Sequence, residues 1–200
     1  MYGEVIMVVI MMLMYWGAIA LTGLAAMGYY IFKSLGLYGI AVHSGNTKPW
    51  LAWIPFARDY LQGELAGEIE LGKRSIRKPG MWLVGFHVGV YVLIIIFFVV
   101  MWVLTFSMAF SVATSGEPFL QLGMFMILYV LVMLIAVVAS AAYMVLKTLV
   151  NFRIFKRYTS SNMSVFHAVL ANTLYLYEAI IFFVFRKRQQ INRVEEQIVE

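Results

Sequence analysis

Three uninterrupted apolar runs constrain this chain more than any other feature of its sequence. They cover residues 5–32, 81–111 and 119–146, and none contains a charged side chain. Roughly 20 apolar residues are enough to cross the hydrocarbon core of a bilayer as an α-helix. The chain is 63% hydrophobic and 12% charged, whereas a soluble domain is closer to about half apolar and a quarter charged. The sequence therefore predicts an all-α, polytopic membrane helix bundle with three full transmembrane helices.

The segments between and after these runs complete the expected organisation. The N-terminal run has no Lys or Arg before it and is longer than the apolar core of a cleaved signal peptide, so we interpret it as a retained span. Residues 112–118 form a short link, which predicts antiparallel packing of the second and third spans. Residues 1–188 are expected to form a single membrane domain. Residues 189–200 are expected to be a short cytoplasmic tail that places Ile191, Val194 and Ile198 on one side of a helix, as a partner contact.

The basic residues predict the topology. Of the 15 Lys and Arg residues, 7 lie between the first two spans, 4 follow the third and 4 lie in the C-terminal tail. Basic residues near span ends remain in the cytoplasm, so the N-terminus is expected outside and the C-terminus inside. A fourth apolar stretch, 163–185, is long enough to span, but crossing would put its basic tail outside. We favour a re-entrant hairpin that bends at Asn172–Thr173 and is covered by the three spans. The alternative, a fourth transmembrane helix, is not excluded by the sequence.

A Trp-Pro segment at residues 49–62 is too short to cross a bilayer and too apolar for an ordinary loop. A proline suits the first position of a helix, the next proline ends that helix, and tryptophan prefers the headgroup boundary. We interpret the segment as an interfacial wedge on the cytoplasmic side, with a re-entrant element lining a cavity as the alternative. Arg58 and Asp59 are expected to form a solvated pair that returns the chain to water. The wedge residues are Pro49, Trp50, Trp53, Pro55 and Arg58.

A short sequence element occurs twice. Lys33-Ser34-Leu35 follows the first span, and Lys147-Thr148-Leu149 follows the third at an offset of 114 residues. In both places a polar loop and another apolar segment come next. Internal repeats of this kind are common in membrane transporters, where sites form at broken helices. The pattern is a hint of an internal duplication.

The stretch "LGLYGIAVHSGNTKPWLAWIPFARDYLQG", followed by the basic "GKRSIRKPG", resembles a group of uncharacterised small integral membrane proteins of Gram-positive anaerobes. These proteins carry a Leu-Gly-Leu-Tyr element and a Pro-Trp-Leu-Ala-Trp-Ile-Pro element before a basic linker. The C-terminal "IFFVFRKR" is also similar. The resemblance covers about 50 residues well and the spans only by their character. It implies a fold type and a bacterial plasma (inner) membrane location, but no reaction or ligand.

Glu178 is the most informative single residue, because it lies in the apolar stretch "YLYEAIIFFVF". A carboxylate at the bilayer centre costs about 2.5–3.5 kcal/mol and is normally paired, protonated or exposed to water. A bend near Asn172 would bring His167 close to it. The expected partners, which together form a candidate polar intramembrane site with Glu178, are His167, Asn172, His87, Tyr175 and Tyr177. Three roles of Glu178 remain open. It could form a hydrogen-bonded pair that holds the hairpin in the bundle, it could handle protons or ions, or it could act as a catalytic acid or base.

His87 lies between Gly85 and Gly89, a small-xxx-small pair that favours close helix packing. We expect His87 to make an interhelical hydrogen bond there. The chain has no cysteine, which excludes disulfides and thiolate metal sites. It has no HExxH, GxSxG or phosphate-binding glycine loop. We therefore expect no metal, no cofactor and no nucleic-acid partner.

The function favoured by the sequence is a non-enzymatic membrane subunit or scaffold in a homo- or hetero-oligomer. The basic cytoplasmic loops are also able to attract anionic lipid headgroups. Two alternatives stay open. One is a small transporter or channel-like protein with its site around Glu178, which a water-filled cavity would favour and a dry, paired Glu178 would oppose. The other is an intramembrane enzyme acting on lipid, for which Glu178 and a histidine would supply the titratable groups.

Overall fold

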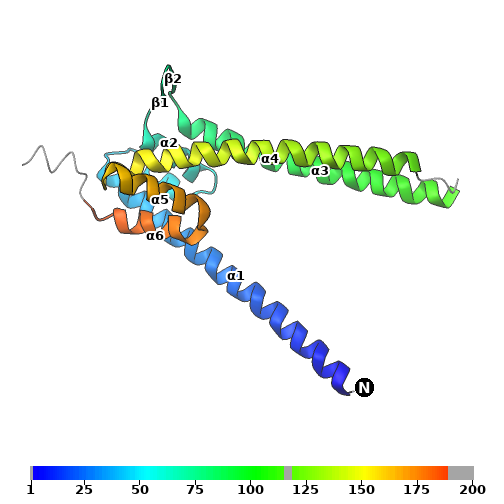
Figure 1. Ribbon diagram of the computed structural model, residues 1–200. Coiled ribbons are helices and arrows are strands. Elements are labelled where there is room, and N and C mark those ends of the chain that lie inside the picture. The colour runs from blue at the N-terminus through cyan, green and yellow to red at the C-terminus, as the bar shows by residue number, and fades with distance from the viewer. Residues whose placement is uncertain (1, 115–118, 189–200) are drawn as a thin grey trace, which may run out of the picture.

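The computed structural model describes residues 2–114 and 119–188 and is almost entirely helical (Figure 1). Three long helices and several short elements make up this part of the chain, which confirms the predicted all-α membrane bundle. In chain order the elements are α1 (Tyr2–His43), the 3₁₀-helix η1 (Pro49–Trp53), α2 (Ala57–Ala66), β1 (Ile69–Leu71), β2 (Arg74–Ile76), α3 (Pro79–Thr114), α4 (Phe119–Phe155), α5 (Ser161–Thr173) and α6 (Tyr175–Phe185). The tail at 189–200, with its expected apolar stripe, lies outside the described residues.

The three long helices are the membrane spans. The stretches Gly3–His43, Pro79–Phe110 and Leu122–Phe155 are each long and apolar enough to cross a bilayer. Helices α3 and α4 pack side by side, whereas α1 leaves the same end of the molecule and diverges from them (Figure 1). Side chains of residues 3–27 of α1 are all exposed. The long helices therefore present their apolar surfaces outward, as a membrane solvent requires.

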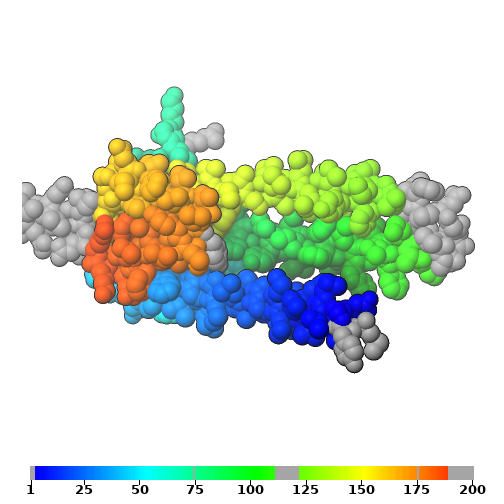
Figure 2. Space-filling view, turned by 60° about the horizontal axis from the view of Figure 1, so that its bottom comes forward, coloured from blue at the N-terminus to red at the C-terminus, as the bar shows by residue number. Residues whose placement is uncertain are grey.

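The short elements gather at one end of the long helices and form a cap (Figure 2). The cap consists of η1, α2, the β-hairpin, α5 and α6, together with the turns of α1, α3 and α4 that they cover. Its apolar core includes Leu37 of α1, Leu61 of α2, Val150 of α4 and Phe182 of α6, all fully buried. Most of the buried side chains of the described residues belong to this cap, so it positions whatever polar site the molecule contains.

Residues 163–185 do not form one continuous helix. Helix α5 ends at Thr173, Leu174 is extended (φ −108°, ψ 104°), and α6 begins at the next residue. Helix α5 packs along α4 and α6 packs along α1, so the segment is a helical hairpin that returns to the cap. The bend predicted at Asn172–Thr173 is confirmed within a residue or two, and an unbroken fourth span is excluded. The three spans do not surround this hairpin as expected, because its main contacts are with α1 and α4 alone.

Two glycines allow the cap helices to approach the spans closely. A Cβ atom at Gly36 of α1 would lie 2.5 Å from the backbone carbon of Phe182 in α6. A Cβ atom at Gly63 of α2 would lie 2.2 Å from the backbone nitrogen of Gly80 at the start of α3. No side chain fits either position without moving a backbone, so these contacts fix α6 on α1 and α2 on α3.

The Trp-Pro segment forms the short helix η1, which begins at Pro49 as predicted. Trp50 and Trp53 are both exposed, at 54% and 39%, and Ile54 and Phe56 continue the exposed apolar surface. Because Trp53 also contacts the ring of Tyr30 on α1, the wedge is attached to the first span. These features fit an interfacial element, in which tryptophan rings lie at the headgroup level.

The basic linker contains a two-stranded antiparallel hairpin that the sequence analysis did not predict. Leu71 pairs with Arg74, leaving Gly72 and Lys73 as a two-residue turn. Gly72 has φ 60°, the left-handed conformation that such tight hairpin turns require. Two short stretches, "IEL" and "RSI", flank the Gly72-Lys73 turn. They are too short and too polar to stand out as strands within a basic linker.

Candidate functional site

Glu178 lies in the first turn of α6 and is completely buried. Its carboxylate forms two ion pairs, one with Lys33 of α1 at 3.1 Å and one with Lys147 of α4 at 3.0 Å. The Lys33 side chain is also buried, and that of Lys147 is 14% exposed. One carboxylate therefore compensates two ammonium groups contributed by two different membrane spans.

Three uncharged side chains complete the surroundings of this carboxylate. The Tyr29 hydroxyl donates to Glu178 Oε2 at 2.8 Å. Gln62 Nε2 of α2 and Asn151 Nδ2 of α4 donate to Oε1 at 3.2 Å and 3.5 Å, and Gln62 also donates to Asn151. We call these residues, with Glu178, Lys33 and Lys147, the Glu178 cluster. It connects α1, α2, α4 and α6 through a single acidic group.

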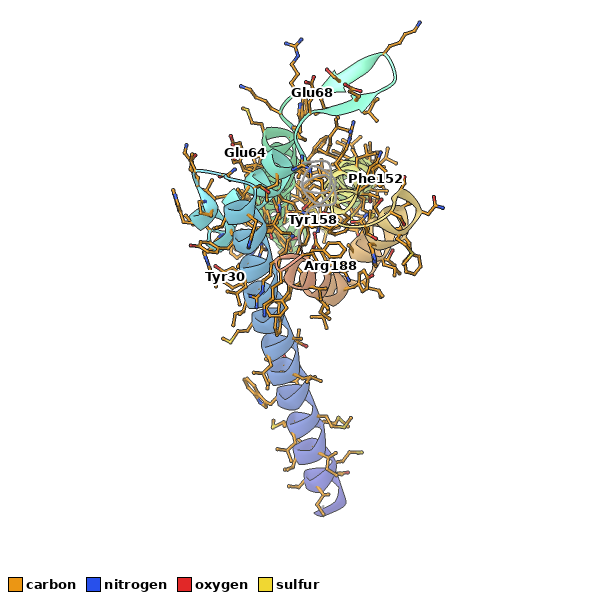
Figure 3. The ribbon with its side chains drawn as sticks, turned by 90° about the vertical axis from the view of Figure 1, so that its left-hand side faces the viewer. Tyr30, Glu64, Glu68, Phe152, Tyr158 and Arg188 are labelled. Carbon is orange, nitrogen blue, oxygen red and sulfur yellow. The ribbon has the colours of Figure 1, made fainter. Side chains whose placement is uncertain are left out.

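Figure 3 shows side chains from several helices crowded together in the cap, while those of the outer half of α1 stand apart. Helical spacing explains the convergence. Tyr29 and Lys33 are four residues apart on α1, as are Lys147 and Asn151 on α4, so each pair occupies one helix face. The hairpin bend then places Glu178 between these two faces.

The repeated sequence element is part of this cluster. Tyr29 and Tyr143 precede the two lysines by four residues and are themselves 114 residues apart, which extends the repeat to Tyr-x-x-x-Lys-Ser/Thr-Leu. The ammonium of Lys33 lies 5.6 Å from the ring centre of Tyr29, and that of Lys147 lies 6.0 Å from the ring centre of Tyr143. The two copies therefore use the same local geometry to present a lysine to the same carboxylate.

A second polar pair lies beside the cluster and corrects an expectation. Asp59 is only 5% exposed, and its Oδ2 shares a 2.6 Å hydrogen bond with His87 Nδ1 of α3. Arg58 is half-buried, with its guanidinium 5.6 Å and 5.5 Å from the rings of Tyr29 and Tyr30. The prediction of a solvated Arg58–Asp59 pair is wrong, because α2 turns Asp59 inward against α3.

The electrostatic surroundings keep Asp59 ionised. Burial alone raises the pKa of this carboxyl group, but the hydrogen bond with His87 and the positive charge of Lys33 act in the opposite direction. Together with the charges of His87 and Lys147 they outweigh burial, and the pKa of Asp59 lies below its ordinary value of 3.8. The expected interhelical hydrogen bond of His87 is confirmed, and its partner is a carboxylate on α2.

The other predicted site residues do not reach Glu178. His167 Nδ1 forms a hydrogen bond with the Tyr177 hydroxyl across the α5–α6 bend. Asn172 donates to Thr148 Oγ1 at 3.0 Å and to the Met144 carbonyl at 3.2 Å, both on α4. These contacts stabilise the α5–α6 hairpin. Tyr175 begins α6, and its side chain lies outside the described part of the chain.

The true partners of Glu178 were missed for an identifiable reason. The charges of Lys33 and Lys147 are already explained by topology at the span ends, and the polar Gln62 and Asn151 carry no spacing signal of their own. The repeat at an offset of 114 residues was the available signal. Two equivalent lysines in a chain with one intramembrane acid predict that both lysines contact that acid.

The chemistry of the site is that of a closed, paired cluster. Both carboxylate oxygens of Glu178 accept hydrogen bonds or ion pairs from the chain itself, and its side chain has no exposed surface. Four buried polar atoms nearby lack a partner within the described residues: Ser34 Oγ, Gln62 Oε1, and Arg58 Nε and Nη1. No group of three His, Cys, Asp or Glu side chains suited to a metal ion occurs in residues 2–114 and 119–188.

Comparison with known proteins returned no matching family model, no matching curated protein and no matching solved structure. The resemblance at the Trp-Pro segment thus stays a prediction. The chain is a multi-pass, all-α membrane protein whose cap is joined to two of its spans through one buried glutamate.

Proposed function

We propose that this protein is a non-enzymatic integral membrane protein that acts as a subunit or scaffold of an oligomeric complex. The observation that carries the proposal is the state of Glu178, which is buried and fully paired with groups of its own chain. A buried charge in this state fixes the relative positions of the helices that supply its partners. In this proposal the cluster serves to hold the cap on the spans.

The same observation weighs against the two alternatives. An ion-handling or catalytic carboxylate needs access to its substrate and a free acceptor position, and Glu178 has no exposed surface. His167, which would be the second titratable group of an enzyme, is bonded to Tyr177 instead. A structural role for Glu178 requires neither access nor a free lone pair.

We propose further that the N-terminus lies outside and the cap lies in the cytoplasm of a bacterial plasma membrane. The described basic residues all belong to the cap or to the span ends that enter it, which fits the preference of such residues for the cytoplasm. Roughly 20 helical residues cross the hydrocarbon core. Counted from the outer ends of α1 and α4, this length ends before Lys33 and Lys147, so the Glu178 cluster would lie near the inner headgroup region.

The membrane half of α1 offers a face for a partner helix. Ala18, Thr22 and Ala25 follow one another at spacings of four and three residues and lie exposed on one side of α1. Small residues at such spacing let helices approach closely in a bilayer. Because α1 diverges from α3 and α4, no other span covers this exposed face within the described residues, and a partner or second copy would cover it.

Site-specific photocrosslinking in native membranes tests the proposal. A photoreactive residue in place of Thr22 is expected to give a discrete crosslinked protein product. The matched control is the same residue in place of Leu24, which lies at nearly the same depth on the opposite side of α1 and is 68% exposed. Crosslinks at Thr22 that exceed those at Leu24 support a subunit role. Lipid adducts alone, at equal levels from both positions, would count against it.

A further inference from the structure

A groove follows the seam between α3 and α4 where the two helices enter the cap. Its upper part has a volume of about 880 Å³, within the range of typical ligand pockets. Its walls are apolar side chains of both helices, including Trp82, Phe86, Val145 and Leu149, and Ile76 of the β-hairpin closes one side. A smaller hollow of about 310 Å³ shares Trp82 and Phe86 with it and continues along the seam as far as Leu93.

Small residues create this groove. Gly85 and Gly89 on α3 line the lower hollow with Ala136 and Ala139 on α4, and Ala142 lines the upper one. A Cβ atom added at Gly85 or Gly89 would meet no other atom within 4 Å. The helix contact expected at these two glycines is therefore absent among the described residues, and an elongated apolar space takes its place.

Two basic residues lie at the mouth of the groove. Arg77 and Lys78 line its upper part, immediately after β2 and before the start of α3. Both side chains are exposed, and neither forms an ion pair with another described residue. The β-hairpin that precedes them stands at the end of the α3–α4 pair where the spans meet the cap (Figure 1).

We propose that this groove binds one anionic phospholipid, with the phosphate headgroup at Arg77 and Lys78 and an acyl chain along the seam between Trp82 and Leu93. Charge complementarity selects the headgroup, because Arg77 and Lys78, which form no ion pair with another described residue, lie beside an apolar slot whose described lining contains no acidic side chain. The geometry selects a lipid, since the charged end lies at the cap and the apolar end follows α3 and α4 from the cap toward their outer ends, as far as Leu93 and Ala136. The inference is independent of the subunit role proposed above.

Native mass spectrometry of the purified full chain tests the site. The protein in detergent micelles is titrated with phosphatidylglycerol and, separately, with phosphatidylcholine of the same acyl chains. We expect phosphatidylglycerol to bind at least about tenfold more tightly. The double variant Arg77→Gln/Lys78→Gln is expected to lower its affinity to that of phosphatidylcholine. Ala142→Leu, which fills the groove, is expected to weaken binding of both lipids.

Matched controls separate this groove from general attraction to basic loops. Lys48→Gln/Lys73→Gln removes the same charge from exposed positions that do not line the groove, and Val138→Leu adds bulk on the lipid-facing side of α4. Both controls are expected to bind phosphatidylglycerol like the unaltered chain. Equal affinity for the two lipids, or an equal loss in the two charge variants, would overturn the proposal.

Discussion

A single buried carboxylate that compensates two lysines, one buried and one largely buried, is the defining feature of this protein at the scale of residues. Removing an ion from water costs several kcal/mol, and only close partners with good geometry offset this cost. Glu178 has such partners in Lys33 and Lys147 and accepts further hydrogen bonds from uncharged groups. Its position in the first turn of α6 adds a favourable interaction with the helix dipole.

Asp59 provides a pH-dependent test at this scale. Because the pKa of folded Asp59 lies below its ordinary value of 3.8, its contribution to stability is present above the unfolded pKa and is lost as pH falls through the folded pKa. Asp59→Asn should therefore lower the thermal unfolding midpoint at pH 7 and equally at pH 5. Below about pH 4 the difference from the unaltered chain should shrink. Unfolding followed by circular dichroism across this range measures it.

A difference between the two proteins that stays constant down to pH 3 would contradict this assignment. It would mean that the ionised form of Asp59 gains nothing from His87 and the nearby lysines. The same titration of His87→Gln serves as a control, because it removes the histidine of the pair and leaves the carboxylate in place.

The sequence predicted the importance of Glu178 but not its partners. An acid in an apolar segment demands a partner on energetic grounds alone, whereas the identity of that partner depends on how distant helices meet. The charge of Lys33 is equally well explained as a topology signal, so it did not identify Lys33 as a partner of Glu178. Asp59 was misjudged because a charged pair next to a proline normally indicates solvent, and only the packing of α2 on α3 buries it.

At the scale of elements, the spans and the hairpin bend were predictable because they rest on local properties. Length and hydropathy define α1, α3 and α4, and an amide beside a threonine in an apolar run marks a weak point for a helix. The β-hairpin and the close packing of α6 on α1 were not predictable. The β-hairpin depends on a short pattern within a basic linker. The packing of α6 on α1 depends on the contact between Gly36 and the backbone of Phe182.

Gly36 gives an element-scale prediction. In Gly36→Val the new side chain would collide with the backbone of Phe182, so α6 would move away from α1 and strain the Glu178 cluster. We expect a loss of about 1–3 kcal/mol in the free energy of unfolding and faster proteolysis of the α5–α6 hairpin. Both are measured on purified protein in detergent.

The matched control is Gly23→Val on the same helix, where a Cβ atom meets nothing within 4 Å. This variant should unfold at nearly the same temperature as the unaltered chain. Equal destabilisation by the two substitutions would show that valine weakens α1 itself, and that the contact with α6 has no special role.

At the scale of the whole molecule, the protein is a cap of short elements attached to one end of three long apolar helices (Figure 2). The cap has two exposed apolar surfaces, one on the Trp-Pro wedge and one on α5 and α6, where Phe166, Leu174 and Ile180 are more than half exposed. Both surfaces suit contact with the headgroup region next to the cap. The divergence of α1 from α3 and α4 has no counterpart in the local sequence, because hydropathy reports the length of a span and not its angle to another span.

The proposed orientation is testable by labelling, since the natural chain has no cysteine. Single cysteines are introduced as Gly3→Cys at the far end of α1 and as Lys187→Cys beside the cap, and intact cells are treated with a membrane-impermeant maleimide. We expect labelling of Gly3→Cys in intact cells and of Lys187→Cys only after permeabilisation. Labelling of Lys187→Cys in intact cells would reverse the orientation.

The most direct test of the structural role of Glu178 is a double-mutant cycle on unfolding in detergent. Glu178→Gln leaves Lys33 and Lys147 facing each other without an acid and should cost roughly 3–5 kcal/mol. Lys33→Met leaves Glu178 paired with Lys147, a pair without net charge, and should lower the free energy of unfolding by less. The double variant leaves only Lys147, which is 14% exposed, and should be more stable than Glu178→Gln alone, with a coupling of about 1 kcal/mol or more. Additive effects, or a Glu178→Gln protein as stable as the unaltered chain, would contradict the account.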